Sequence, residues 1–179
     1  QIGAGTAWAS NLDGHGVKVA VLDTGYDTDH PDLVDRVSLS KSFVPGETIE
    51  DANTHGTHTA STVGGSGAAS DGLEKGVAYD ADLLIGKVLG DSGYGEDSWV
   101  IAGMEWAADN GARVVSMSLS GDTPNDGTEP MCAAVDSISQ STGALFVAAA
   151  GNNGNEATMS CPSAANSALT VAAVDGEDH

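Results

Sequence analysis

The chain is short of basic residues. It has 6 Lys and Arg against 26 Asp and Glu, which gives a formal net charge of −20 over 179 residues at pH 7. A surface with so few cations has no electrostatic attraction for phosphate backbones or anionic lipid headgroups. We therefore expect no nucleic acid and no membrane among its partners, and the excess negative charge favours solubility.

Aromatic residues, cysteines and long apolar runs are also scarce. Aromatic residues make up 4% of the chain, and no apolar stretch approaches the roughly 20 residues that span a bilayer. The two cysteines, Cys132 and Cys161, are too few for a disulfide scaffold and too widely spaced for a CxxC metal or redox motif. A single bridge remains an option. Because 40% of the residues are hydrophobic, the length fits one globular domain with its own core.

Apolar runs alternate with amphipathic segments along the chain. Five runs have the length of strands, at 17–22, 83–89, 113–117, 145–150 and 169–174. Three segments between them have helical spacing, at 56–63, 98–109 and 131–141. Ser98 is the expected N-cap of the second helix and Gly111 its expected stop. Loops rich in Gly, Ser, Asp and Thr are expected at 41–53, 64–75, 90–97 and 121–129. The alternation predicts βαβ units, and therefore an α/β fold with a parallel sheet.

The first predicted strand ends in a carboxylate. The run Val19-Ala-Val-Leu-Asp23-Thr24-Gly25 is typical of a central strand that is buried on both faces and delivers one polar residue at its carboxyl end. Ligands and chemistry in α/β folds lie at that edge of the sheet. Asp-Thr-Gly is also the turn of the aspartic proteases, but those enzymes use two carboxylates that share a proton, and this chain has one copy.

A histidine follows in the segment Thr54-His55-Gly56-Thr57-His58. A buried carboxylate can hold an imidazole in one tautomer, so that the imidazole takes a proton from a hydroxyl nucleophile. We therefore expect Asp23 and His55 to form such a pair. A zinc site on the two histidines is the alternative, but their spacing lacks the adjacent Glu of the usual helical zinc motif. A Rossmann-type nucleotide site would need G-x-G-x-x-G after the first strand, which the chain does not have.

Together with Ala148-Ala-Ala-Gly151-Asn152-Asn153-Gly154, these motifs resemble the subtilisin-like serine proteases, the subtilases of peptidase family S8. That family has Asp-Thr/Ser-Gly after a strand, His-Gly-Thr-His opening a helix and Ala-Ala-Gly-Asn at a strand end, in this order. The segments Val88–Gly95, Ser98–Trp106 and Ser116–Leu119 are also similar to the family, and the loops look most like secreted actinobacterial members. The resemblance implies a three-layer α/β sandwich whose mostly parallel central sheet is flanked by helices. It also implies an extracellular enzyme, with residues 1–179 as the N-terminal two thirds of a single catalytic domain.

The resemblance implies roles for the matching residues. Asp23 would be the orienting carboxylate, His55 the general base and acid, and Asn152 the side-chain donor of the oxyanion hole, a kind of donor whose loss costs roughly 10²–10³ in rate in subtilisin itself. A purely structural role for Asn153 or its turn is the alternative interpretation of that stretch. The implied substrate-binding positions are a strand that pairs with extended substrate, Gly93, Tyr94 and Gly95, one pocket wall, Ser118, Leu119 and Ser120, and the facing wall, Ala149, Ala150 and Gly151.

The chain departs from the family at the nucleophile. The family's serine lies in Gly-Thr-Ser-Met-Ala, and no serine here has that context or that of Gly-x-Ser-x-Gly. We therefore interpret the chain as a truncated or nicked piece of a serine endopeptidase that acts on polypeptides through an acyl-enzyme. Its partner would be the C-terminal segment that bears the serine. The alternative is an incompetent fragment or pseudoprotease that binds a propeptide or a protein inhibitor.

Three further expectations concern ions, cysteines and charge. The chemistry needs no cofactor, but Asp32 in His-Pro-Asp-Leu resembles a ligand of a structural calcium ion, although loop 64–75 does not match the family's calcium loop. A secreted enzyme would oxidise Cys132 and Cys161 to a disulfide. Glu96 and Asp97, next to the substrate-pairing strand, predict a preference for cationic residues upstream of the cleaved bond, with an ordinary solvated acidic loop as the alternative.

Overall fold

A six-stranded parallel sheet forms the middle of the molecule. The computed structural model describes residues 2–121, 123–152, 154 and 159–174. The strands are β1 (Lys18–Asp23), β2 (Val37–Ser42), β3 (Asp82–Lys87), β4 (Val114–Met117), β5 (Leu145–Ala149) and β6 (Ala168–Val171). Their order is β2-β3-β1-β4-β5-β6, and every neighbouring pair is parallel. β1 therefore lies inside the sheet, as its apolar sequence predicts.

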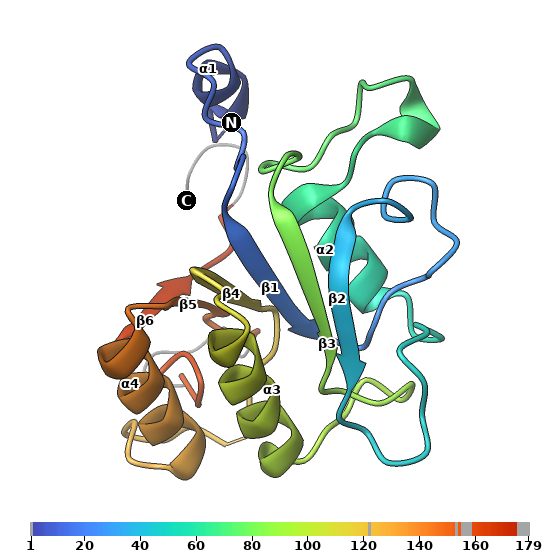
Figure 1. Ribbon diagram of the computed structural model, residues 1–179. Coiled ribbons are helices and arrows are strands. Elements are labelled where there is room, and N and C mark those ends of the chain that lie inside the picture. Colours follow the sequence, from blue (N-terminus) through green and yellow to red (C-terminus); the bar gives the residue numbers. More distant parts are fainter. Residues whose placement is uncertain (1, 122, 153, 155–158, 175–179) are drawn as a thin grey trace.

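Helices cover both faces of this sheet (Figure 1). The helical elements are α1 (Ala4–Trp8), α2 (His55–Gly64), the 3-10 turn η1 (Ala68–Ser70), α3 (Asp97–Asp109) and α4 (Pro130–Thr142). On one face α2 packs against β1 and β3, and on the other face α3 packs on the same strands while α4 contacts α3 and β5. The predicted three-layer α/β architecture is confirmed. No helix of the described part is both long and apolar enough to cross a bilayer.

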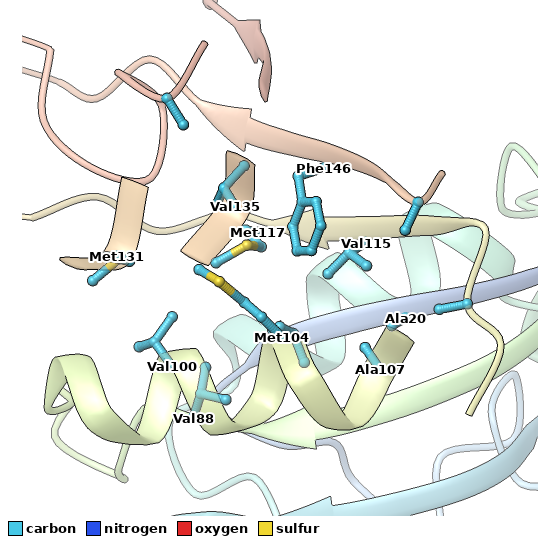
Figure 2. Close-up of a cluster of buried hydrophobic side chains, with 14 of the residues drawn as sticks. Ala20, Val88, Val100, Met104, Ala107, Val115, Met117, Met131, Val135 and Phe146 are labelled. Atoms are coloured by element: carbon cyan, nitrogen blue, oxygen red, sulfur yellow. The ribbon is translucent and has the colours of Figure 1, made fainter. Parts of the chain in front are cut away.

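The side chains of β1 alternate between two hydrophobic cores. Ala20 and Leu22 join the larger core under α3 and α4, while Val19 and Val21 join the smaller core under α2. Successive residues of a strand point to opposite faces, so a strand covered on both sides is apolar throughout. Figure 2 shows the larger core, in which Met104 of α3 and Phe146 of β5 lie among aliphatic side chains.

The strand and helix predictions are confirmed to within a few residues, and the corrections lie at edges and ends. The edge strand β2 was not predicted, because its alternating Val-Ser-Leu-Ser pattern is short and half exposed. Its last two residues fall in the predicted loop 41–53, just as η1 falls in the predicted loop 64–75. Ser98 is not the N-cap of α3, since that helix begins at Asp97 with Glu96 as its N-cap. Gly111 does follow the end of α3, with a positive φ of 82°.

A disulfide joins α4 to the segment beyond β5. Cys132 and Cys161 are linked across a sequence separation of 29, with Cα atoms 5.3 Å apart. Both residues are buried in the larger core. The Cys161 carbonyl accepts the amide N–H of Gly121 at 2.9 Å, so the bridge also ties down the loop that follows β4.

Removing this disulfide will destabilise the protein. For a closed loop of this size the chain-entropy model gives about 3–4 kcal/mol. We expect Cys132→Ala with Cys161→Ala to lower the free energy of unfolding by about that amount, measured with denaturant on full-length protein inactivated by His55→Ala. Non-reduced, denatured protein should show no alkylatable thiol, and two freely alkylated thiols would contradict the assignment.

Candidate active site

Asp23 and His55 form a hydrogen-bonded pair at the carboxyl edge of the sheet. Asp23 is the last residue of β1 and His55 the first residue of α2. His55 Nδ1 lies 2.7 Å from Asp23 Oδ1. The Asp23 side chain is fully buried, whereas 45% of the His55 side chain is exposed. With Nδ1 directed at the carboxylate, Nε2 is the ring nitrogen available for proton transfer.

Further donors fix the Asp23 carboxylate. The amide N–H of Thr24 donates to Oδ1 at 2.7 Å, and the Thr59 hydroxyl donates to Oδ2 at 3.1 Å. Thr59 lies one helical turn after His55, so α2 supplies both the imidazole and a group that orients its partner. A buried carboxylate with hydrogen bonds to both oxygens is held in a single orientation.

A second carboxylate, Asp51, holds the start of α2. Its Oδ1 accepts the amide N–H groups of Asn53 at 3.1 Å and Thr54 at 3.0 Å. Its Oδ2 accepts both the amide N–H and the hydroxyl of Thr57, at 2.8 and 2.6 Å. Thr54, directly before His55, has the left-handed φ of 82° that is unfavourable for a β-branched residue. The Asp51 bonds therefore compensate backbone strain at the residue next to the imidazole.

These bonds also determine the charge state of Asp51. Burial disfavours the charged carboxylate, but hydrogen bonds from Thr57, Thr24 and Thr54 outweigh burial and hold the pKa of Asp51 below its usual value of 3.8. Asp51 is thus an anion at neutral pH. Asp51 precedes α2, but its carboxylate accepts the amide N–H of Thr57 in the first turn of that helix, so the charge also has a favourable interaction with the helix dipole.

Thr24 connects the two carboxylates. Its hydroxyl donates to Asp51 Oδ1 at 2.8 Å and accepts the amide N–H of Gly56 at 2.8 Å. A Cβ on Gly56 would come within 2.2 Å of the Gly25 carbonyl oxygen, so α2 can approach the end of β1 only with glycine at this position. The short approach is what brings His55 to Asp23.

A buried lysine supports the same edge from β3. Lys87 is fully buried, and its Nζ donates to the Thr24 carbonyl at 2.7 Å, the Glu50 carbonyl at 3.1 Å and Asp91 Oδ1 at 2.6 Å. Glu47 Oε2 lies 3.3 Å from the same nitrogen. The hydrogen bond from Lys87 holds the pKa of Asp91 below its usual range. A buried charge is costly unless it is paired, so Lys87 keeps its bonds to Asp91 and to the Thr24 carbonyl. Through these two bonds it holds the turn at 90–95 in a fixed position relative to Thr24.

A cavity of about 380 Å³ opens beside His55. It is lined by two groups of the predicted substrate-binding residues, Gly93, Tyr94 and Gly95, and Ser118, Leu119 and Ser120. The first group belongs to the 90–95 turn that Lys87 anchors, and the second follows the carboxyl end of β4. The structure thus brings these segments together around His55.

The other predicted residues lie at the same edge without lining this cavity. Ala149 ends β5, and Ala150 and Gly151 follow it. A Cβ on Gly151 would stand 3.8 Å from Ser120 Oγ, so the segments after β4 and β5 are neighbours. Asn152 is exposed just beyond them, and Asn153 lies outside the described residues. The role of Asn152 in an oxyanion hole stays a prediction.

Asp32 anchors the loop after α2. Its Oδ1 accepts the amide N–H of Ala69 at 2.8 Å, and its carbonyl accepts that of Ser66 at 3.0 Å. Within the described ranges, no three His, Cys, Asp or Glu side chains gather as an ion site. The side chains as they stand do not fit a carboxylate-rich calcium site, and calcium at Asp32 stays a prediction.

Sequence reasoning did not identify Asp51, Thr59 or Lys87 as parts of the site. A signal existed for Thr59, four residues after His55 on one helical face, and for Asp51, an acidic residue just before a helix start. Lys87 gave none, because a lysine at the end of an apolar run is usually solvated.

Residues 14–179 match the Subtilase family, Peptidase_S8. The chain is 41% identical over 177 residues to the major intracellular serine protease of Bacillus subtilis (strain 168), covering 93% of this chain and 54% of that protein. Subtilisin Savinase of Lederbergia lenta is 43% identical over 176 residues, covering 98% and 62% respectively. Subtilisin E of Bacillus subtilis (strain 168) is 39% identical over 183 residues, covering 99% and 46%.

The chain therefore belongs to the subtilase family. It spans about half the length of the relatives that it matches. These relatives come from Bacillus and Lederbergia, and the likeness of the loops to actinobacterial members stays a prediction.

Asp51→Asn will destabilise the protein in a pH-dependent way. Replacing a charged acceptor of several hydrogen bonds should cost at least about 2 kcal/mol of unfolding free energy at pH 7. Because the folded-state pKa of Asp51 is lowered, its contribution is present above the unfolded value and is lost as pH falls through the folded value. The stability gap between wild type and variant should therefore shrink below about pH 4.

Denaturant unfolding at a series of pH values, on full-length protein carrying His55→Ala, checks this. Asp35→Asn, at an exposed carboxylate, is the matched control and should change little. A gap that is constant from pH 7 to pH 3 would contradict the assigned role of the Asp51 charge.

Proposed function

We propose that this chain is the N-terminal portion, residues 1–179, of a single subtilisin-like catalytic domain, and that the complete enzyme is a serine endopeptidase. The observation that carries the proposal is the 2.7 Å contact between His55 and the buried Asp23, beside a cavity lined by two candidate substrate segments. Membership of the subtilase family supports it. The proposed substrate is a polypeptide, cleaved through an acyl-enzyme.

The geometry suits a general base whose tautomer is fixed. Asp23 holds the Nδ1 proton, so Nε2 accepts the proton of an attacking serine hydroxyl as its oxygen bonds to the peptide carbonyl. The buried carboxylate stabilises the imidazolium, which then gives that proton to the departing amine. Asn152 would donate its side-chain amide N–H to the oxygen that becomes negative. Water repeats the sequence to release the acyl group.

The serine would come from a segment outside this chain. The match covers 54% and 46% of two relatives, so both contain sequence outside the matched part. A groove of about 380 Å³ beside α2 supports it, because its lining is almost entirely apolar and includes Val17, Val63, Val114 and Val147. We propose that the serine-bearing segment covers this groove.

A pseudoprotease that binds a propeptide or an inhibitor is the second candidate. Segment 93–95 favours it, because Tyr94 and Gly95 are exposed and an extended peptide could pair there without chemistry. A Gly-Thr-Ser-Met-Ala stretch in the remainder of the gene would decide for the peptidase.

Location and ions complete the proposal. We propose a secreted enzyme, supported by the Cys132–Cys161 disulfide, since such bonds persist in oxidising compartments. One relative is named as intracellular, so relatedness alone does not assign the compartment. The proposed chemistry uses no cofactor. A calcium ion at Asp32 would need ligands other than a cluster of carboxylates, and elemental analysis of the dialysed protein tests for it.

Asp23→Asn in the full-length enzyme should lower kcat by about 10⁴, because the imidazole loses its fixed tautomer and the stabilisation of its protonated form. The corresponding loss measured in subtilisin itself is about 3 × 10⁴. The molecule contains a matched control, since His15 Nδ1 lies 2.7 Å from Asp80 Oδ2 in an exposed pair. Asp80→Asn should leave kcat unchanged in a peptide hydrolysis assay. Equal effects of the two variants would remove Asp23 from the mechanism.

Residues 1–179 purified alone should show no covalent labelling by a fluorophosphonate and no peptide hydrolysis. In subtilisin itself, loss of the serine costs about 2 × 10⁶ in kcat. The full-length enzyme, as positive control, should be labelled on a peptide outside residues 1–179, identified by mass spectrometry. Labelling of a serine inside residues 1–179 would overturn the assignment of the nucleophile to another segment.

A further inference from the structure

The cavity beside His55 has an apolar floor. Four of its lining residues are hydrophobic side chains, Leu89, Val100, Leu119 and Met131. Val100 of α3 and Met131 of α4 are 2% and 5% exposed and belong to the larger core, and Figure 2 shows them at the same end of that cluster. The floor is therefore rigid, and a side chain entering the cavity would lie along packed aliphatic groups.

One carboxylate stands at this cavity. Asp97 is part of the lining and is its only carboxylate among the described residues, beside the titratable side chains of His55 and Tyr94, whereas the adjacent Glu96 is not part of it. Asp97 is exposed and is the first residue of α3. The helix N-terminus offsets only about half a unit charge, so a negative field remains at the cavity.

Among the described residues, no lysine or arginine side chain neutralises that carboxylate. The chain has six Lys and Arg in all, each within the described residues, and none of them lines the cavity. Lys87, at the same edge, is committed to Asp91 and Glu47. The charge on Asp97 is thus available to a ligand.

We infer that Asp97 makes this cavity a subsite for a Lys or Arg side chain of the substrate, upstream of the cleaved bond. The aliphatic stem lies along Leu89, Val100 and Met131, and the cationic head meets Asp97 at the rim, as long basic side chains arrange themselves on apolar surfaces. As part of this inference the subsite is placed upstream, since Asp97 lies two residues beyond segment 93–95, the proposed substrate-pairing strand. This inference rests on the proposed function and adds the substrate class.

The test uses full-length enzyme and fluorogenic peptides that carry Lys, norleucine or Glu at each of five positions upstream and two positions downstream of the cleaved bond. The norleucine peptide keeps the stem and removes the charge. At one upstream position the ratio of kcat/KM for Lys over norleucine should exceed one, by about two- to fivefold at low salt, and should fall as salt screens the charge. Asp97→Asn should bring this ratio to about one. Asp97→Lys should make the Glu peptide a better substrate than the Lys peptide at that position.

Glu96→Gln is the matched control, because it removes one neighbouring carboxylate that does not line the cavity. It should leave the ratio unchanged. The inference is overturned if the enzyme hydrolyses the peptides but Asp97→Asn does not change the Lys-to-norleucine ratio of kcat/KM. It is also overturned if Asp97→Asn and Glu96→Gln change that ratio equally. Either result leaves the proposed function intact. A ratio above one only at downstream positions also overturns it. Absence of hydrolysis and of fluorophosphonate labelling in the wild type would overturn the proposed function, and this inference with it.

Discussion

The hydrogen bonds accepted by Asp51 are the constraint on which the site depends. They join the loop before α2, the first turn of that helix and, through the Thr24 hydroxyl, the end of β1. Since the imidazole and its carboxylate come from α2 and β1, a shift of either element would open their 2.7 Å contact. A buried anion that accepts several bonds tolerates little displacement, because each lost bond would leave a charged acceptor unsatisfied.

The sequence alone was sufficient to predict the inner strands of the sheet and the pairing of Asp23 with His55. Residues 19–22 of β1 are all apolar, which is typical of a strand buried on both faces, and the motif at His55 resembles the family motif in which a histidine opens a helix. The edge strand β2 left no such pattern, because its short Val-Ser-Leu-Ser run is half exposed. Local signals existed for Asp51 and Thr59, but their bonds to Thr24 and Asp23 span 27 and 36 residues, and the contact of Lys87 with Thr24 spans 63 residues, which no local pattern encodes.

Charge is distributed unevenly between the inside and outside of this molecule. The chain carries a net charge of −20, yet one of its few cations is fully buried at Lys87, where it binds two carboxylates and two carbonyls. That cation holds the 90–95 turn where the proposed substrate strand begins. Just beyond the turn, Asp97 faces the cavity with no compensating cation among the residues that line it. The same edge of the sheet thus has a rigid part, where Lys87 is neutralised by carboxylates, and an open, negatively charged part at Asp97.

The valine-lined groove beside α2 has a consequence for synthesis of the protein. On the proposed function, the segment that covers the groove follows this chain, so the ribosome releases the imidazole and its carboxylate before the nucleophile. The nascent chain would expose the apolar groove to solvent for the seconds needed to synthesise the segment that covers it. Such a state is prone to aggregation or to binding by chaperones. It would also be incapable of proteolysis during that interval. The order of the catalytic groups along the polypeptide thereby delays activity until the groove is filled.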